Sequence, residues 1–122
     1  MPRQSRSKWN HKFCFKPQSA NRMFYRAKQL TVQYRQWREA IYEDINMERK
    51  WPFKADDKLE FNVKIGVSSK LFDVDNAIKP LLDTFQYMFD FNDRMVFKVT
   101  IKKEWVKKGE EYFDVTATKY GG

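Results

Sequence analysis

The sequence has one cysteine, one histidine and no long apolar run, and each scarcity excludes a class of protein. A single cysteine, Cys14, can form neither an internal disulfide nor a cysteine-rich zinc site. No segment approaches the ~18 apolar residues that a membrane-spanning helix needs. The first residues, MPRQSRSKWNHK, are basic and polar, and the apolar run of a signal peptide does not follow them. We therefore expect a soluble, cytoplasmic protein with no membrane partner.

Basic residues are in excess, with 24 Lys and Arg against 16 Asp and Glu and a net charge of +8. This balance favours a polyanionic partner, and nucleic acid is the first candidate. A membrane surface is a weaker one, because no helix here pairs a basic face with a strongly apolar one. The only histidine, His11, lies near the basic N-terminal stretch, and we interpret it as a surface residue rather than a general base.

The 122 residues have the size of a single domain, without repeats or low-complexity linkers. We expect a flexible basic arm over residues 1–10 and one domain over residues 11–120. Alternation over residues 12–16 predicts a first strand, ended by Pro17, in which Cys14 is a small packed residue. The stretch PQSANRMFYR, residues 17–26, is rich in turn formers and reads as a loop.

Two segments have helical periodicity. Starting at Thr31, apolar residues recur at spacings of three and four on one helical face. These are Tyr34, Trp37, Ile41 and Ile45. A second such face comprises Ile78, Leu81, Leu82, Phe85 and Phe89. Pro80 stands early in this second helix, so the helix either starts close to Lys79 or bends there.

Three further segments alternate as strands do. Residues 58–67 place apolar side chains on one face only, and residues 95–101 and 113–117 do the same. Lys107–Glu110 reads as a turn, so we expect the last two strands to pair as a hairpin. The expected order is β-α-β-α-β-β. It predicts an α+β domain, in which one mixed sheet has two helices on one face.

Asp73 and Asp75 lie at the junction between an extended segment and the second helix. In an extended chain, residues two apart point the same way, so both carboxylates can reach one point. Lys79 comes one helical turn after Asp75, and Asp83 one turn further. A helix of about four turns, rising ~1.5 Å per residue, carries the chain to the far end of the sheet. Asp93 therefore returns to this point only if the chain folds back or another subunit supplies it.

Two interpretations of these acids stand at this point. Carboxylates beside a lysine suit Mg²⁺, which prefers oxygen ligands and retained waters. The ion can activate a water and neutralise charge on a phosphodiester. Alternatively, an aspartate before a helix is a common N-cap, and Asp93 lies in a turn-like FND sequence. The D-x-D spacing alone does not separate the two.

The segments DVDNAIKPLLD and NDRMV together resemble the RusA family of Holliday junction resolvases. The family motif is D-x-D-N, a lysine three residues later, an aspartate at the helix end, and a second acidic turn before a strand. The stretch PQSANRMFYR is similar to the family's P-x-S-x-N pattern, and YRQWREAI fits its first helix. Two features depart from the family: Asn92 stands where a second acid is frequent, and Lys70 stands alone where members carry an arginine run.

The resemblance implies a small, basic, dimeric, Mg²⁺-dependent endonuclease. Asp73, Asp75 and Asp93 would hold Mg²⁺, and the metal would activate the attacking water. Lys79 would stabilise or position the scissile phosphate. A symmetric homodimer would place two such sites on opposite strands of a four-way DNA junction and make paired nicks, as DNA recombination and repair require.

Supporting roles follow from the same resemblance and from the residue types. Asn76 would orient the site, and Asp83 would either tether Lys79 across a helical turn or be a solvated helix residue.

Nucleic acid contacts are expected from Lys70 and from Arg22 and Arg26. The neighbouring Phe24 and Tyr25 would either stack on unpaired bases or cover a sheet edge. The alternative function is a non-catalytic protein that binds branched DNA on the same scaffold.

Overall fold

The structure is a computed structural model that describes residues 8–17, 24–25, 29–45, 51–70, 72, 74–89 and 91–121. For residues 24, 25, 29, 30, 75 and 76 it describes the backbone only. Four strands form the main sheet, namely β1 (Lys8–Phe13), β4 (Leu59–Val67), β5 (Val96–Trp105) and β6 (Tyr112–Lys119). The two helices are α1 (Val32–Asp44) and α2 (Asp75–Met88).

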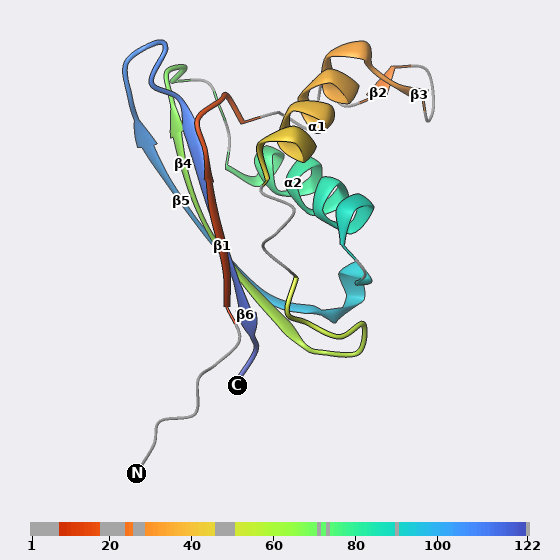
Figure 1. The fold of residues 1–122 in the computed structure, drawn as a ribbon. Helices are drawn as coiled ribbons and strands as arrows, with labels where there is room; N and C mark the ends of the chain where they lie inside the picture. Colours follow the sequence, from red (N-terminus) through yellow and green to blue (C-terminus); the bar gives the residue numbers. More distant parts are fainter. Residues whose placement is uncertain are drawn as a thin grey trace.

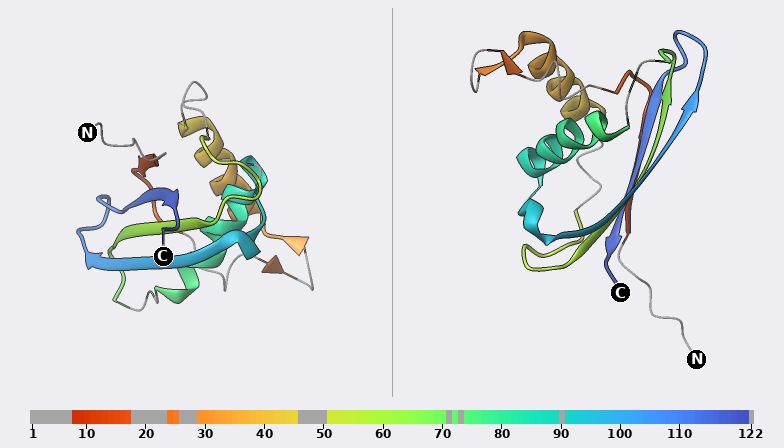
Figure 2. Two further views of the ribbon diagram at one scale, coloured as in Figure 1. Left: turned by 90° about the horizontal axis from the view of Figure 1, so that it is seen from below. Right: turned by 180° about the vertical axis from the view of Figure 1, so that it is seen from behind.

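The sheet is mixed, with the strand order β1-β6-β4-β5, and both helices lie on one of its faces (Figure 1, Figure 2). β4 runs parallel to β5, whereas β6 is antiparallel to both β4 and β1. The helix α2 connects the two parallel strands, as such a crossover requires. The predicted class, an α+β domain with a mixed sheet and two helices on one face, is confirmed.

The core lies between the sheet and the helices, and β4 is its centre. Every second residue of β4, from Leu59 to Val67, is at most 6% exposed. Phe85 of α2 packs its ring edge-on against Trp9 of β1 at 5.2 Å and against Phe61 of β4 at 6.2 Å. The predicted alternation over residues 58–67 is therefore confirmed, and it identifies the helix-facing side of the sheet.

The helix α1 has the face that its periodicity predicted, since Tyr34, Trp37 and Ile41 are buried. Thr31 caps it by accepting a hydrogen bond from the Tyr34 amide at 3.1 Å. A short ladder precedes it, in which β2 (Phe24–Tyr25) pairs with β3 (Gln29–Leu30). Part of the expected loop is thus a small hairpin, because two extended pairs face each other across residues 26–28.

The first strand begins earlier than predicted, at Lys8, and ends at Phe13. Residues 8–10 of the expected arm therefore belong to the sheet, while residues 1–7 lie outside the described part. The cause is Trp9, which is 1% exposed among core aromatic rings. His11 joins β1 to α1 through a 2.8 Å contact between its Nε2 and Asp44 Oδ2. Cys14 follows the strand and is exposed, so the prediction that it packs is wrong.

The expected hairpin of the last two strands is also wrong, because β4 lies between β5 and β6. The connection, residues 106–111, crosses the end of β4, and the Val106 amide donates to the Val67 carbonyl at 2.9 Å. Beside this crossing, Gly66 pairs with Tyr112 of β6, and a Cβ on residue 66 would lie 2.3 Å from Cε1 of Tyr112. In the observed order β4 is an interior strand, and its apolar face is buried against the helix layer.

Candidate functional site at the junction of β4 and α2

The helix α2 begins at Asp75, and Val74 occupies its N-cap position with helical dihedral angles. Val74 has no side-chain acceptor, so Asp75 is a first-turn residue and the N-cap interpretation of Asp75 is wrong. An acid in the first turn is favoured by the helix dipole. Asp73 lies outside the described residues, and the side chains of Asp75 and Asn76 do too.

Pro80 lies inside α2, so the helix does not start near Lys79. Proline has no N–H, and it therefore cannot donate the helical hydrogen bond to the carbonyl of Asn76. Tyr34 of α1 supports the chain at this point, since its hydroxyl lies 3.3 Å from the Pro80 carbonyl and 2.9 Å from Thr84 Oγ1. The first turn of α2 thus combines Asp75 with a carbonyl oxygen that takes no hydrogen bond from residue 80.

Of the two roles left open for Asp83, the structure shows the contact with Lys79, with Lys79 Nζ 3.3 Å from Asp83 Oδ2. Their side chains are 57% and 32% exposed. A pair of this kind stabilises a helix by only about 0.3–0.5 kcal/mol. The contact therefore restrains the ammonium of Lys79 on the same side of α2 as Asp75 without fixing it, and it leaves most of Lys79 accessible.

The connection from β4 to α2 is anchored by hydrogen bonds on both sides. Ser68 Oγ donates to Glu111 Oε2 at 2.6 Å, and the Gly109 amide donates to Glu111 Oε1 at 2.7 Å. The Ser68 hydroxyl and nearby amides lower the pKa of Glu111, which stays ionised. Lys103 Nζ of β5 donates to the Phe72 carbonyl at 2.9 Å, one residue before Asp73. The Phe72 carbonyl is therefore joined to β5.

Lys103 is the residue of this region that the sequence interpretation missed, although a signal exists. The helix-facing positions of β5 are Val99, Ile101, Lys103 and Trp105, because they pair with buried residues of β4. A lysine in this apolar alternation indicates a specific partner, and the Phe72 carbonyl is that partner. Lys70 of the same connection lies with its Nζ 5.7 Å from the centre of the Trp105 ring.

Asp93 lies at the opposite end of α2 from Asp75 (Figure 1). It begins a single 3-10 turn, Asp93–Met95, which Asn92 caps by accepting from the Arg94 amide at 3.0 Å. The fourteen residues of α2 span ~21 Å, so one chain does not bring Asp93 to Asp75. Asn92, at the position where the RusA family often has an acid, is thus a turn cap here.

A divalent cation needs several oxygen donors at one point. Among residues whose side chains the structure describes, no three His, Cys, Asp or Glu gather into such a set. By sequence, the oxygen donors beside the start of α2 are the carboxylates of Asp73 and Asp75, whose type suits Mg²⁺ but which are too few to hold it alone. Asp93 can add to them only from a second copy of the chain.

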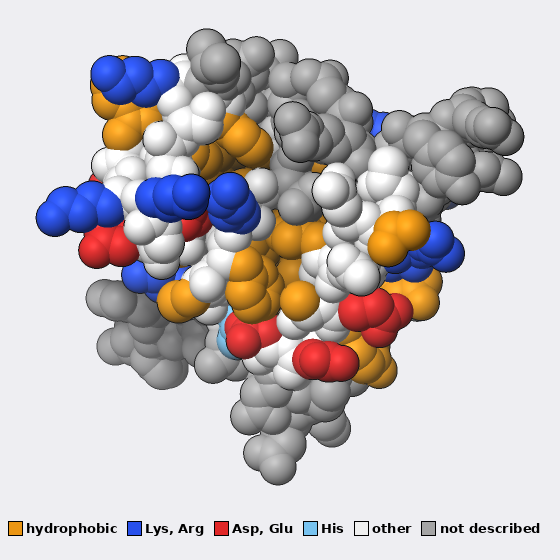
Figure 3. Space-filling model, turned by 90° about the horizontal axis from the view of Figure 1, so that it is seen from above, with side chains coloured by type: hydrophobic (Ala, Val, Ile, Leu, Met, Phe, Trp, Pro, Cys, Tyr) orange, Lys and Arg blue, Asp and Glu red, His pale blue; other side chains and the backbone are white. Residues whose placement is uncertain are grey.

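The proposed nucleic acid contacts lie in two places. Phe24 and Tyr25 belong to the β2–β3 hairpin, which lies beyond the start of α1 and away from the sheet (Figure 1, Figure 2). Arg22 and Arg26 lie outside the described residues. Lys70 follows the end of β4 by three residues, near Trp105 at the end of β5. Several Lys and Arg side chains lie on the face of the molecule seen in Figure 3.

No protein-family model matches the chain, and no curated protein matches it either. The resemblance to the RusA family therefore depends on the quoted motifs alone. Across the described ranges, no helix is both long and apolar enough to cross a membrane.

Proposed function

We propose that this protein is a Mg²⁺-dependent endonuclease that resolves four-way DNA junctions by paired symmetric nicks, in cytoplasmic DNA recombination and repair. The observation that carries the proposal is the first half of α2. Asp75, Lys79 and Asp83 follow one another at single helical turns, and the last two form an ion pair at 3.3 Å. An exposed ammonium next to carboxylates suits a phosphodiester whose charge a metal neutralises.

Each residue has a distinct proposed role. Asp73 and Asp75 hold Mg²⁺, which supplies an activated water when it is bound. Lys79 stabilises charge that develops on the scissile phosphate, and Asp83 limits the range of its ammonium. Asn76 orients the site through its place in the first turn of α2.

The proposal requires a homodimer, because Asp93 and Asp75 lie at opposite ends of the same helix. A second copy would supply Asp93 to complete the set of acids. Two such composite sites related by a twofold axis match the symmetry of a four-way junction, which has two strands to cut. The net charge of +8 supports binding to its phosphates.

The alternative is a protein of the same fold that binds branched DNA without cutting it. Carboxylates near a phosphate repel it unless a metal is bound, so a binding protein gains nothing from Asp73 and Asp75. This repulsion favours the nuclease over the binding protein.

The proposal is tested by Asp75→Asn and Asp73→Asn on a synthetic four-way junction in Mg²⁺. Each variant should lose cleavage while gel-shift affinity is kept or increased, since a repulsive charge is removed. Asp56→Asn is the matched control, because Asp56 is exposed in a turn before β4 and should cut normally. Full cleavage by either site variant would remove that residue from the site, and equal loss in the control would point to a general charge effect.

A further inference from the structure

The outer edge of β5 is open and unusually long. β5 has ten residues and pairs with β4 on one side, and no described strand pairs with its other side. Such an edge offers a row of backbone donors and acceptors to another strand. The other edge strand of the sheet, β1, has six residues.

The helix-facing side of β5 is apolar apart from Lys103, and it is poorly covered. Val99 and Trp105 are 36% and 63% exposed, whereas Phe61 and Val63, one strand further in, are 1% and 6% exposed. The helix layer therefore ends over β4. A shallow apolar hollow continues from Val99 to residues of α2, including Ile78 and Leu82. We call Val99, Ile101, Trp105, Ile78 and Leu82 the β5 strip.

We propose that the β5 edge is the homodimer interface, where two copies pair their β5 strands antiparallel about a twofold axis through Ile101. Apolar residues that the helix layer leaves exposed beside an open edge indicate a partner that provides both a strand and an apolar face. A second copy provides both. This surface would form the dimer that the proposed function requires, but the dimer does not itself depend on nuclease activity.

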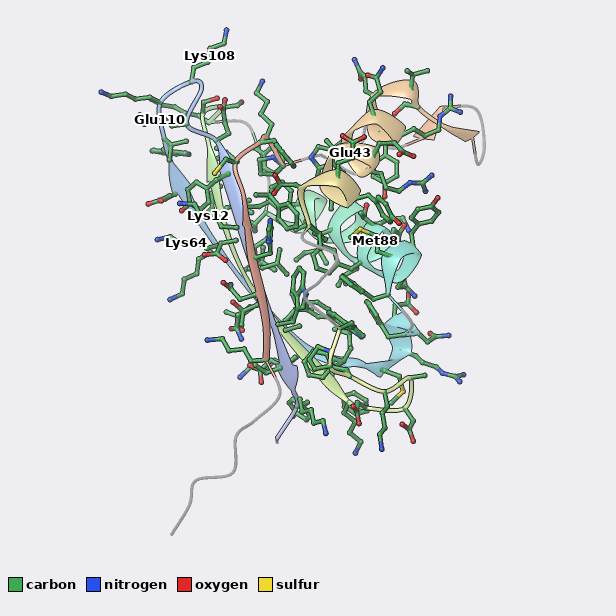
Figure 4. The ribbon with its side chains drawn as sticks, in the orientation of Figure 1. Lys12, Glu43, Lys64, Met88, Lys108 and Glu110 are labelled. Carbon is green, nitrogen blue, oxygen red and sulfur yellow. The ribbon has the colours of Figure 1, made fainter. Side chains whose placement is uncertain are left out.

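The polarity of the two sheet faces fixes the direction of the axis. The outer face of the sheet carries lysines such as Lys12 and Lys64, which extend away from the helices (Figure 4). With an axis perpendicular to the sheet, the helices of both copies lie on the same side of the joined sheet, so the two β5 strips form one continuous surface. An axis in the plane of the sheet would instead place each strip beside the partner's Lys98 and Lys102.

Among pairs centred on Thr100, Ile101 and Lys102, the charges of β5 favour the one centred on Ile101. Its only acid is Glu104. When the pair is centred on Ile101, Lys98 of each copy lies opposite Glu104 of the other. Over residues 97–105, no lysine then lies opposite a lysine of the partner. Centring on Thr100 would oppose Lys98 and Lys102, and centring on Lys102 would oppose that lysine to itself. Opposite charges across a strand pair are favourable, and like charges are unfavourable.

This arrangement has a consequence for the candidate site. β4 and β5 are parallel, with Leu59 beside Val96 and Val67 beside Trp105. In the antiparallel dimer, the start of the partner's β5 lies at the end of the sheet where β4 finishes. The turn with the partner's Asp93 would therefore lie at the same end as the connection from β4 to α2.

Cysteine cross-linking tests the register in the full chain, with Cys14→Ser as background because Cys14 is exposed. Ile101→Cys should form a disulfide-linked dimer on mild oxidation, since position 101 is opposite itself. Val99→Cys and Lys103→Cys should not cross-link separately, because identical positions are ~14 Å apart along the strands, but their mixture should. Self-linking by Val99→Cys, or no link in the mixture, would overturn the register.

Sedimentation equilibrium tests the surface independently. Wild-type protein should be a dimer and Ile101→Lys a folded monomer, because the substitution opposes two lysines at the axis. Asn62→Lys adds the same charge on exposed β4, one strand from the edge, and should leave the dimer intact. A monomeric wild type, or a dimeric Ile101→Lys, would overturn the interface. A cross-linked dimer that cuts no junction would instead refute only the proposed function.

Discussion

Replacing Gly66 by alanine should be strongly destabilising, because the ring of Tyr112 occupies the space of the new side chain. The added Cβ would lie 2.3 Å from Cε1 and 2.5 Å from Cδ1 of Tyr112, and 3.1 Å from Cγ1 of Val106. Contacts this short force the ring to move. The ring is held, since its hydroxyl donates to Glu104 and Lys12 lies 4.7 Å above its face.

The cost has two parts. Overpacking a filled site costs about 1–3 kcal/mol. Moving the Tyr112 hydroxyl away from the Glu104 carboxylate removes a hydrogen bond to a charged group, which is worth about 1.5–3 kcal/mol when it is fully lost. A partial shift of the ring gives an expected loss of roughly 2–4 kcal/mol in the free energy of unfolding. With a urea m-value of about 2 kcal/mol/M, the midpoint should fall by about 1–2 M.

Urea denaturation of a double-mutant cycle tests the origin of this loss. In a Tyr112→Leu background, Gly66→Ala should cost much less, because the aromatic carbons that it meets are gone. Gly121→Ala is the control, since nothing lies within 4 Å of a Cβ there, and it should change stability by less than ~0.5 kcal/mol. An equal cost of Gly66→Ala with and without Tyr112 would refute the close packing of the Tyr112 ring against residue 66.

Three further predictions concern catalysis, binding and pH. Lys79→Ala should lower the cleavage rate roughly 10²–10³-fold while the gel-shift affinity falls far less, because the ammonium acts on charge that builds in the transition state. Equal losses of rate and affinity would assign Lys79 to binding. The affinity for junctions should fall with salt at a log–log slope of about −0.9 per phosphate neutralised, and Arg22→Ala and Arg26→Ala should each reduce that slope by about one. The free energy of unfolding should not depend on these tyrosines below about pH 10 and should fall above it. Burial, and next the hydrogen bond to Glu104, raises the pKa of Tyr112 from 10.0 to about 12. Burial also raises the pKa of Tyr34. The unfolded chain then loses protons first, so urea midpoints of Tyr112→Phe should depend less on alkaline pH than those of the wild type.

Periodicity predicted the buried faces of β4 and α1, but the predicted face of β5 is largely uncovered, since Phe97 is 51% exposed. Alternation in β4 and the spacing of Tyr34, Trp37 and Ile41 identified buried sides correctly, because burial of apolar surface dominates both patterns. Strand neighbours were not predictable in the same way. Alternation states which side of a strand is buried but not which strand lies beside it, and the position of β4 between β5 and β6 depends on long-range contacts such as Gly66 with Tyr112.

The candidate site was predictable where it is local. Helical spacing allowed Lys79 to pair with Asp83, and the structure shows that ion pair. Helix length left open whether Asp93 returns to Asp75 by a fold of the chain or from another subunit, and in the structure α2 keeps the two apart within one chain. The anchoring of Phe72 by Lys103 was missed, since it joins residues that only the parallel pairing of β4 and β5 brings together.

The central claim is Mg²⁺-dependent cleavage of branched DNA, and one assay tests it directly. Wild-type protein is incubated with a labelled four-way junction and with a linear duplex of the same arm sequence, in Mg²⁺ and in EDTA. We expect symmetric nicks in two opposing strands of the junction in Mg²⁺, little cutting of the duplex, and no cutting in EDTA. Binding of the junction without cleavage in Mg²⁺, or equal cutting of the linear duplex, would contradict the claim.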